Sequence, residues 1–92
     1  MFEWSEEKNI FLLENRGVCF EDVLEAIKSG NLLADKPHFN QQRYPNQGIL
    51  YVLIEDYVYC VPYVKKETLF LKTIYPSRKA TRKFLKDRKW EK

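Results

Sequence analysis

The chain has 92 residues, of which 45% are apolar and 32% are charged, and its formal net charge is +3. This composition is typical of one small globular domain and excludes a disordered chain. No apolar run approaches the roughly 20 residues that a membrane-spanning helix needs. The first residues carry no secretory signal pattern, and the two cysteines form no CxxC pair. We therefore expect a cytoplasmic protein with reduced thiols.

The charged residues are distributed unevenly along the chain. Residues 65–92 contain eleven Lys or Arg against three Asp or Glu, a net charge of +8, whereas residues 1–64 have a net charge of −5. Since charges of one sign attract a polyanion, a nucleic acid is expected to approach the C-terminal third of the chain.

Two helices are predicted in the first third of the chain. Ser5 is a suitable N-cap for the first helix, and Gly17 is a natural residue to follow its last turn near Arg16. A second helix is expected from Phe20 to Gly30, because apolar residues follow the i, i+3, i+4, i+7 spacing of one buried face. These residues are Phe20, Val23, Leu24 and Ile27.

Strand patterns follow a polar stretch at residues 35–48. Three strands are predicted at residues 49–55, 57–64 and 68–75, and a fourth short strand at residues 32–35 is left open. The first long strand is apolar on both faces, as is typical of a central strand. A turn near Glu55 and Asp56 is expected to join it to the next strand as a hairpin.

The last predicted element is a basic helix. Pro76 ends the third long strand, and Ser77 is a suitable N-cap for a helix that runs to about Lys89. The elements predict a single α+β domain over residues 1–92, in which the helices cover one face of a three- to four-stranded antiparallel sheet. Two helices precede the sheet, and the C-terminal basic helix follows it.

Two cations stand at the start of the basic helix. Arg78 and Lys79 lie where the helix dipole disfavours positive charge, and a bound phosphate is the simplest group that would offset this cost. A solvated basic helix without a ligand is the plainer alternative. The strand tyrosines allow two interpretations as well, because they suit packing against helices and would also form a base-stacking platform beside the cations.

Metal and cofactor chemistry is not indicated by any motif in the chain. His38 is the single histidine and has no partner at metal-ligand spacing, so we interpret it as a surface loop residue. The glycines form no phosphate-binding loop, and neither cysteine has a neighbouring histidine. We therefore expect no metal and no cofactor.

Three segments in the same order resemble the BrnT family of bacterial toxins. Residues 2–9 read FEWSEEKN, residues 16–22 read RGVCFED, and residues 72–81 read KTIYPSRKAT. The family patterns that they resemble are F-x-W-D-x-x-K-N, H-G-V-S-F-E-E and R-I-I-S-A-R-K-A. The resemblance implies a compact relative of the RelE-like ribonucleases, with two helices packed on a four-stranded antiparallel sheet and a C-terminal helix. It also implies a type II toxin–antitoxin system with a DNA-binding antitoxin, for example one of the ribbon-helix-helix class.

The resemblance assigns individual positions and also shows departures. Trp4 and Lys8 match the first motif, Arg78 and Lys79 match the third, and Arg43 matches an arginine that the family often has before its first long strand. Three positions depart from the family patterns: Arg16 replaces the usual histidine, Cys19 replaces the usual capping residue, and Lys72 replaces an arginine. The change at residue 72 keeps the charge but loses the bidentate guanidinium.

These considerations lead to a hypothesis of metal-independent RNA cleavage through attack by the 2′-hydroxyl. The expected catalytic residues are Arg78, Lys72 and Lys8, which would stabilise the phosphorane or transfer protons. The expected substrate-binding residues are Lys79, Arg82, Arg43, Trp4 and Tyr75. The expected partners are RNA and a cognate antitoxin, with no membrane. The alternative is a non-catalytic RNA-binding or protein-interaction module on the same fold.

Overall fold

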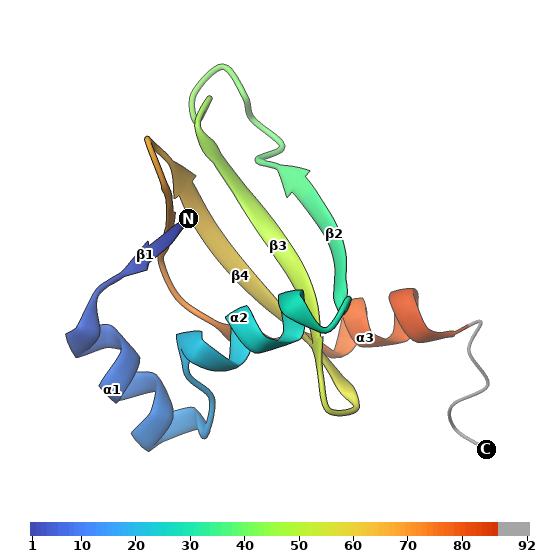
Figure 1. Cartoon of the computed structure of the whole chain (residues 1–92). Helices are drawn as coiled ribbons and strands as arrows, with labels where there is room; N and C mark the ends of the chain where they lie inside the picture. Colours follow the sequence, from blue (N-terminus) through green and yellow to red (C-terminus); the bar gives the residue numbers. More distant parts are fainter. Residues whose placement is uncertain (87–92) are drawn as a thin grey trace.

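The computed structural model describes residues 1–86 of the chain (Figure 1). The helices are α1 (Glu6–Arg16), α2 (Phe20–Lys28) and α3 (Arg78–Leu85). The strands are β1 (Phe2–Trp4), β2 (Leu32–Pro37), β3 (Gln47–Ile54), β4 (Tyr57–Lys65), β5 (Leu69–Leu71) and β6 (Tyr75–Pro76). The predicted end of the last helix near Lys89 lies outside the described residues. Within residues 1–86, no helix is long and apolar enough to cross a membrane.

The first two helices begin at the residues that the sequence predicts. The helix α1 also ends at the predicted Arg16, whereas α2 ends at Lys28, before the predicted end at Gly30. Ser5 Oγ accepts a hydrogen bond from the first turn of α1 at 3.2 Å. Gly17 takes a φ of +70° and donates its N–H to the Leu13 carbonyl at 3.1 Å. At the start of α2, the carboxylate of Asp22 in the first turn accepts a hydrogen bond from the Cys19 N–H at 3.0 Å. Asp22 thereby compensates for the poor N-cap side chain at Cys19.

One buried side chain, Asn9, joins α1 to α2. Its Oδ1 accepts the Phe20 N–H at 2.6 Å, and its Nδ2 donates to the Glu21 carboxylate at 2.8 Å. The hydrogen bond from Asn9 lowers the pKa of Glu21, and a carboxylate in the first turn also interacts favourably with the dipole of α2. A single amide therefore links α1 to the first turn of α2.

The sheet has six strands and is mixed, whereas the sequence predicts three or four antiparallel strands. The strand order is β1-β5-β4-β3-β2, with β6 paired to β4. The first strand runs parallel to β5, with Phe2 opposite Leu69 and Trp4 opposite Leu71. The predicted strand 68–75 is divided into β5 and β6. Both errors concern strands of two or three residues, which are too short to show a period of two.

Helices cover both faces of the sheet, so the prediction that they cover one face is wrong. Leu50 and Val52 of β3 pack in one cluster with core residues of α1 and α2. Tyr51, the residue between them, belongs to a second cluster with Ala80 and Leu85 of α3. Because alternate residues of a strand face opposite sides, α3 lies across the sheet from α2. The pattern of β3, apolar on both faces, already favours such a covered strand.

A buried hydroxyl positions α3 on β4. Thr81 is 5% exposed, and its Oγ1 accepts the Val58 N–H at 2.9 Å and donates to the Ser77 carbonyl at 2.7 Å. The Ser77 N–H donates to the Val58 carbonyl at 3.0 Å, and Ser77 Oγ accepts the Ala80 N–H at 2.9 Å. These hydrogen bonds therefore fix the position of the first turn of α3 on β4. This position determines where the cations of α3 lie.

On the opposite face, Tyr63 connects β4 to β2 across β3. Its hydroxyl donates to Asp35 Oδ1 at 2.6 Å, and its ring is 8% exposed. A Cβ at Gly48 would meet the Tyr63 hydroxyl oxygen at 2.5 Å, so only glycine leaves room for this contact. Burial, followed by the hydrogen bond and the charge of Asp35, raises the pKa of Tyr63 from 10.0 to about 12.

The raised pKa of Tyr63 predicts a loss of stability at high pH. The folded state holds the phenol proton more tightly than the unfolded chain, so this contribution is complete below pH 10.0 and is lost as pH rises toward about 12. Tyr63→Phe is expected to lower the free energy of unfolding at pH 7 and to flatten this alkaline decrease. Urea unfolding at several pH values measures both effects. Equal pH dependence in the two proteins would contradict the assignment.

Candidate functional site

A cavity lined by lysines and tyrosines lies where α3 meets the sheet. We call it the basic pocket, and its volume is about 310 Å³. It is lined by Lys36, Tyr51, Cys60, Tyr75, Ser77, Lys79, Ala80, Lys83 and Phe84. Among the residues that the structure describes, no Asp or Glu lines this pocket. The pocket therefore carries positive charge that no lining carboxylate neutralises.

The floor of the basic pocket is a row of residues across the sheet. Tyr51 of β3 pairs with Cys60 of β4, and Cys60 pairs with Tyr75 of β6. On the other side, β2 brings Lys36 opposite Ile49, next to this row. One wall is α3, whose N-cap Ser77 places Lys79 in its first turn. The pocket thus combines side chains from five elements that are separated in the sequence.

The ammonium groups of Lys36 and Lys83 lie close together. The close approach of the Lys36 ammonium group, and then its positive charge, lower the pKa of Lys83. Both ammonium groups also approach the Phe84 ring, with Nζ at 5.8 Å from the ring centroid for Lys36 and 5.9 Å for Lys83. Since like charges repel, an anion placed between the two lysines would relieve this repulsion.

The two tyrosines and the cysteine of the basic pocket have raised pKa values and keep their protons. Burial raises the pKa of Tyr51 and of Tyr75, and in Tyr75 the neighbouring Cys60 adds to the effect. Burial also raises the pKa of Cys60, although hydrogen bonds with Tyr75 and Ser77 act in the opposite direction. The two phenols are therefore hydrogen-bond donors to an anion, and the buried thiol is a poor nucleophile.

The structure divides the predicted cations between different places. Lys79 and Tyr75 line the basic pocket, whereas Arg78 and Arg82 line a separate cavity of about 360 Å³. That second cavity is completed by Tyr57 and Thr81. Consecutive residues on a helix point about 100° apart, which separates Arg78 from Lys79.

Lys72 is exposed between β5 and β6 and lines none of the described cavities. The predicted cations Arg78, Lys79 and Lys72 therefore do not line one common cavity among those described.

The three remaining predicted site residues also lie away from the basic pocket. Trp4 stacks on Phe20 with ring centroids 5.3 Å apart and an interplanar angle of 21°, so one ring face is occupied by the core. Lys8 lies on α1 with its Nζ 5.1 Å from the Phe11 ring centroid. Arg43 is exposed in the loop between β2 and β3. Of the eight predicted residues, only Lys79 and Tyr75 belong to the pocket.

Two central residues of the basic pocket, Lys36 and Lys83, were not singled out from the sequence. Lys83 is one of several cations on a basic helix, and no local signal distinguishes it from the others. Lys36 follows the short strand left open at residues 32–35 and comes from the acidic part of the chain. The extension of β2 to Pro37 and its pairing with β3 bring Lys36 to the pocket. This pairing is non-local and leaves no periodic signal.

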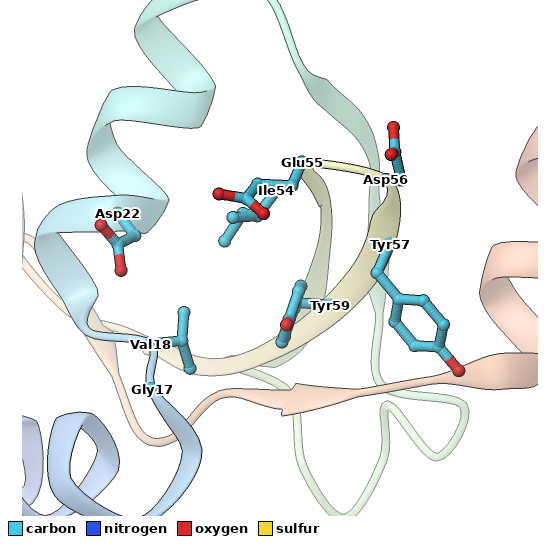
Figure 2. A pocket seen from close by; sticks show the side chains of 8 residues that line it. All are labelled: Gly17, Val18, Asp22, Ile54, Glu55, Asp56, Tyr57 and Tyr59. Atoms are coloured by element: carbon cyan, nitrogen blue, oxygen red, sulfur yellow. The ribbon is translucent and has the colours of Figure 1, made fainter.

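A third cavity, of about 530 Å³, is lined by acidic residues (Figure 2). Its acidic residues come from α2 and from the β3–β4 turn. Figure 2 shows Asp22 and Glu55 facing each other across this cavity, with Asp56 farther along the turn. Asp22 already caps α2, and the negative charges disfavour a phosphate here. Within residues 1–86, no group of three or more His, Cys, Asp or Glu could hold a metal ion.

Comparisons of the chain with protein-family models, with curated proteins and with solved structures found no match. The fold and the basic pocket define an α+β protein with a cationic, aromatic cavity between a helix and a mixed sheet. The BrnT resemblance therefore rests on the three sequence motifs alone.

Proposed function

We propose that this chain is a ribonuclease toxin of a type II toxin–antitoxin system, which binds RNA and cleaves it in the basic pocket. The observation that carries the proposal is the clustering of Lys36, Lys79 and Lys83 around one cavity with no described carboxylate lining it. A phosphodiester is an anion of the right kind for such a cavity. The phenols of Tyr51 and Tyr75 add neutral donors beside it.

The proposed reaction uses the nucleophile that RNA itself provides. The 2′-oxygen forms a bond to the phosphorus while the bond from phosphorus to the 5′-oxygen breaks. The products are a 2′,3′-cyclic phosphate and a 5′-hydroxyl. Lys36 and Lys79 stabilise the charge that develops on the phosphorane oxygens, since preorganised cations act most strongly on developing charge. The proton of the 2′-hydroxyl goes to a base, and a proton is returned to the 5′-oxygen.

Lys83 is the group in the basic pocket best suited to exchange protons. Lys36 lowers the pKa of Lys83, so Lys83 gives up its proton more readily than an ordinary lysine does. Tyr51, Tyr75 and Cys60 are shifted in the opposite direction and remain protonated. We assign Lys83 as the general base toward the 2′-hydroxyl. Arg78 and Arg82, in the adjacent cavity, would then hold the RNA backbone rather than the scissile phosphate.

The proposal predicts RNA cleavage by the purified chain in the presence of EDTA. The expected products end in 2′,3′-cyclic phosphates, because the 2′-oxygen is the nucleophile. Mass spectrometry of a short RNA after incubation identifies these ends, and the same RNA with methylated 2′-hydroxyls is the control. Cleavage of the methylated RNA, or products with 3′-hydroxyl ends, would contradict this mechanism.

A non-catalytic RNA-binding module is the second candidate function. The observation that favours it is the raised pKa of Tyr51, Tyr75 and Cys60 in the basic pocket, since these protonated groups can donate to an anion but do not act as bases. Salt-dependent binding of RNA that stays intact would support this alternative.

The toxin proposal also includes a DNA-binding antitoxin as the partner. A partner that neutralises the toxin by covering the basic pocket would have to supply negative charge to the lysines there. Co-purification with a protein encoded next to this chain, and competition of that protein with RNA, test this part. A co-purified neighbour that leaves RNA binding unchanged would argue against docking at the pocket.

A further inference from the structure

The loop between β2 and β3, residues 38–46, contains three aromatic rings and a guanidinium group that pack in a row. The rings of Phe39 and His38 have centroids 4.7 Å apart with an interplanar angle of 28°. His38 and Tyr44 follow at 4.4 Å and 40°, and the Arg43 guanidinium carbon lies 5.6 Å from the Tyr44 centroid. We call this group the aromatic ladder. His38, expected to be a surface loop residue, is its partly buried second ring.

Hydrogen bonds within the loop hold the ladder in place. The His38 N–H donates to the Gln47 carbonyl at 2.8 Å, and the Tyr44 N–H donates to the Asn40 carbonyl at 2.9 Å. The Asn40 N–H donates to His38 Nδ1 at 3.0 Å, and Asn40 Oδ1 accepts the Arg43 N–H at 3.1 Å. The stack is therefore preorganised, which reduces the entropy lost when a further planar group is added.

The outermost ring of the aromatic ladder, Phe39, is 95% exposed. A single exposed apolar residue is ordinary on a protein surface. Here the exposed ring is the end of an ordered stack, and its packing on His38 leaves most of its surface in water. Packing of the domain does not account for its position, whereas a planar partner on its free side would extend the stack by one member.

The charge and polarity around the aromatic ladder favour a nucleobase as that partner. From Lys36 to Ile54 the chain contains no Asp or Glu, so no carboxylate of this stretch repels a phosphate. Arg43 provides a cation, and exposed Gln41 and Gln42 provide amides that can bond to base edges. Stacking of an unpaired base on an aromatic ring contributes about 1–3 kcal/mol and tolerates any base, because each base has a π face.

The aromatic ladder is close to the basic pocket along β2. Lys36 lines the pocket, and Phe39 follows it by three residues, so their Cα atoms lie within about 11 Å of each other. A single RNA strand can therefore contact both places at once. In Figure 1 the β2–β3 loop lies at the end of the sheet opposite the β3–β4 turn, so the acidic cavity at that turn is distant from the ladder.

We propose that Phe39 and the aromatic ladder behind it form a stacking site for an unpaired base of single-stranded RNA. The site deepens the proposed function and rests on it, because the same strand places its phosphodiester in the basic pocket. The ladder selects single-stranded over double-stranded RNA, since the faces of paired bases inside a duplex are already covered.

The test uses a short single-stranded RNA that carries 2-aminopurine and methylated 2′-hydroxyls, so that binding is measured without cleavage. Phe39→Ala is expected to weaken binding by about tenfold to a hundredfold and to remove the fluorescence quenching caused by stacking. Phe39→Trp should retain both. Arg43→Gln should weaken binding and lower the slope of log K against log salt by about 0.7, the contribution of one phosphate contact on a single strand.

Matched controls make the result specific. Phe11→Ala removes another exposed phenylalanine, on α1, and is expected to leave binding unchanged. A duplex of the same sequence should bind wild type and Phe39→Ala equally. Unchanged affinity and quenching in Phe39→Ala, or an equal loss on the duplex, would overturn the stacking site.

If Lys36→Gln and Lys83→Gln abolish binding while Phe39→Ala does not, the ladder proposal fails and the proposed function stands. The reverse result supports the ladder and rejects the pocket.

Discussion

Lys83→Gln is expected to lower the rate of RNA cleavage by about 10²–10⁴-fold, the typical contribution of a positioned general acid or base. Lys36→Gln should reduce the rate as well and should also change its pH dependence. Removing the positive charge of Lys36 raises the pKa of Lys83, so the rise of the rate with pH moves to higher pH in this variant. Pre-steady-state cleavage rates measured across a pH series give both results.

The controls for these variants are cations outside the basic pocket. Lys86→Gln removes an equal charge next to the same helix, and Lys28→Gln removes one on the opposite face of the sheet. Neither lines the pocket, so both should stay near the wild-type rate. Arg78→Ala should raise KM more than it lowers kcat, because Arg78 lies in the adjacent cavity. Wild-type cleavage in Lys83→Gln would reject the assigned base.

Phe20→Ala is expected to lower the free energy of unfolding by about 3–5 kcal/mol, as is usual for removing a buried phenylalanine. Phe20 has no exposed surface, packs in the core cluster between α2 and the sheet, and stacks on Trp4 of β1. Domains of this size are stable by about 5–15 kcal/mol, so the variant should be close to unfolding. Urea unfolding followed by circular dichroism measures the loss.

Phe11→Ala is the matched control for this substitution. The Phe11 side chain is 47% exposed on α1, and its removal should change stability by less than about 0.5 kcal/mol. A comparable loss in the two variants would show that the core is not centred on Phe20. Phe20→Leu separates the cavity from the loss of stacking on Trp4, since leucine refills most of the volume.

The parts of the fold that could be predicted are those with strong local signals. The caps at Ser5 and Gly17 and the apolar spacing from Phe20 onward correctly predict α1 and α2. The β3–β4 hairpin is predicted by two apolar runs around Glu55 and Asp56. These signals are local because a helical turn or a tight turn involves residues within a few positions of one another.

Such signals predict neither β1 nor the division of the predicted strand 68–75 into the short strands β5 and β6. Each has two or three residues, and each exists because a distant segment offers free backbone groups. The N-terminal strand, for example, pairs with β5 across more than sixty residues of chain, with Glu3 opposite Phe70. Formation of these short strands depends on tertiary pairing more than on the propensity of the segment itself.

The candidate site, like the fold, could be predicted only where local sequence signals define it. The amino-acid sequence by itself determines that positive charge accumulates in the C-terminal third, that Ser77 starts a basic helix there, and that Tyr75 and Lys79 flank this start. Only the tertiary structure decides that Lys79 and Arg78 line different cavities and that Lys36 joins Lys83. The physical reason is that composition, caps and periodicity are properties of neighbouring residues. A pocket depends on strand pairing and on the face of the sheet that a helix covers, which are set by contacts between distant residues.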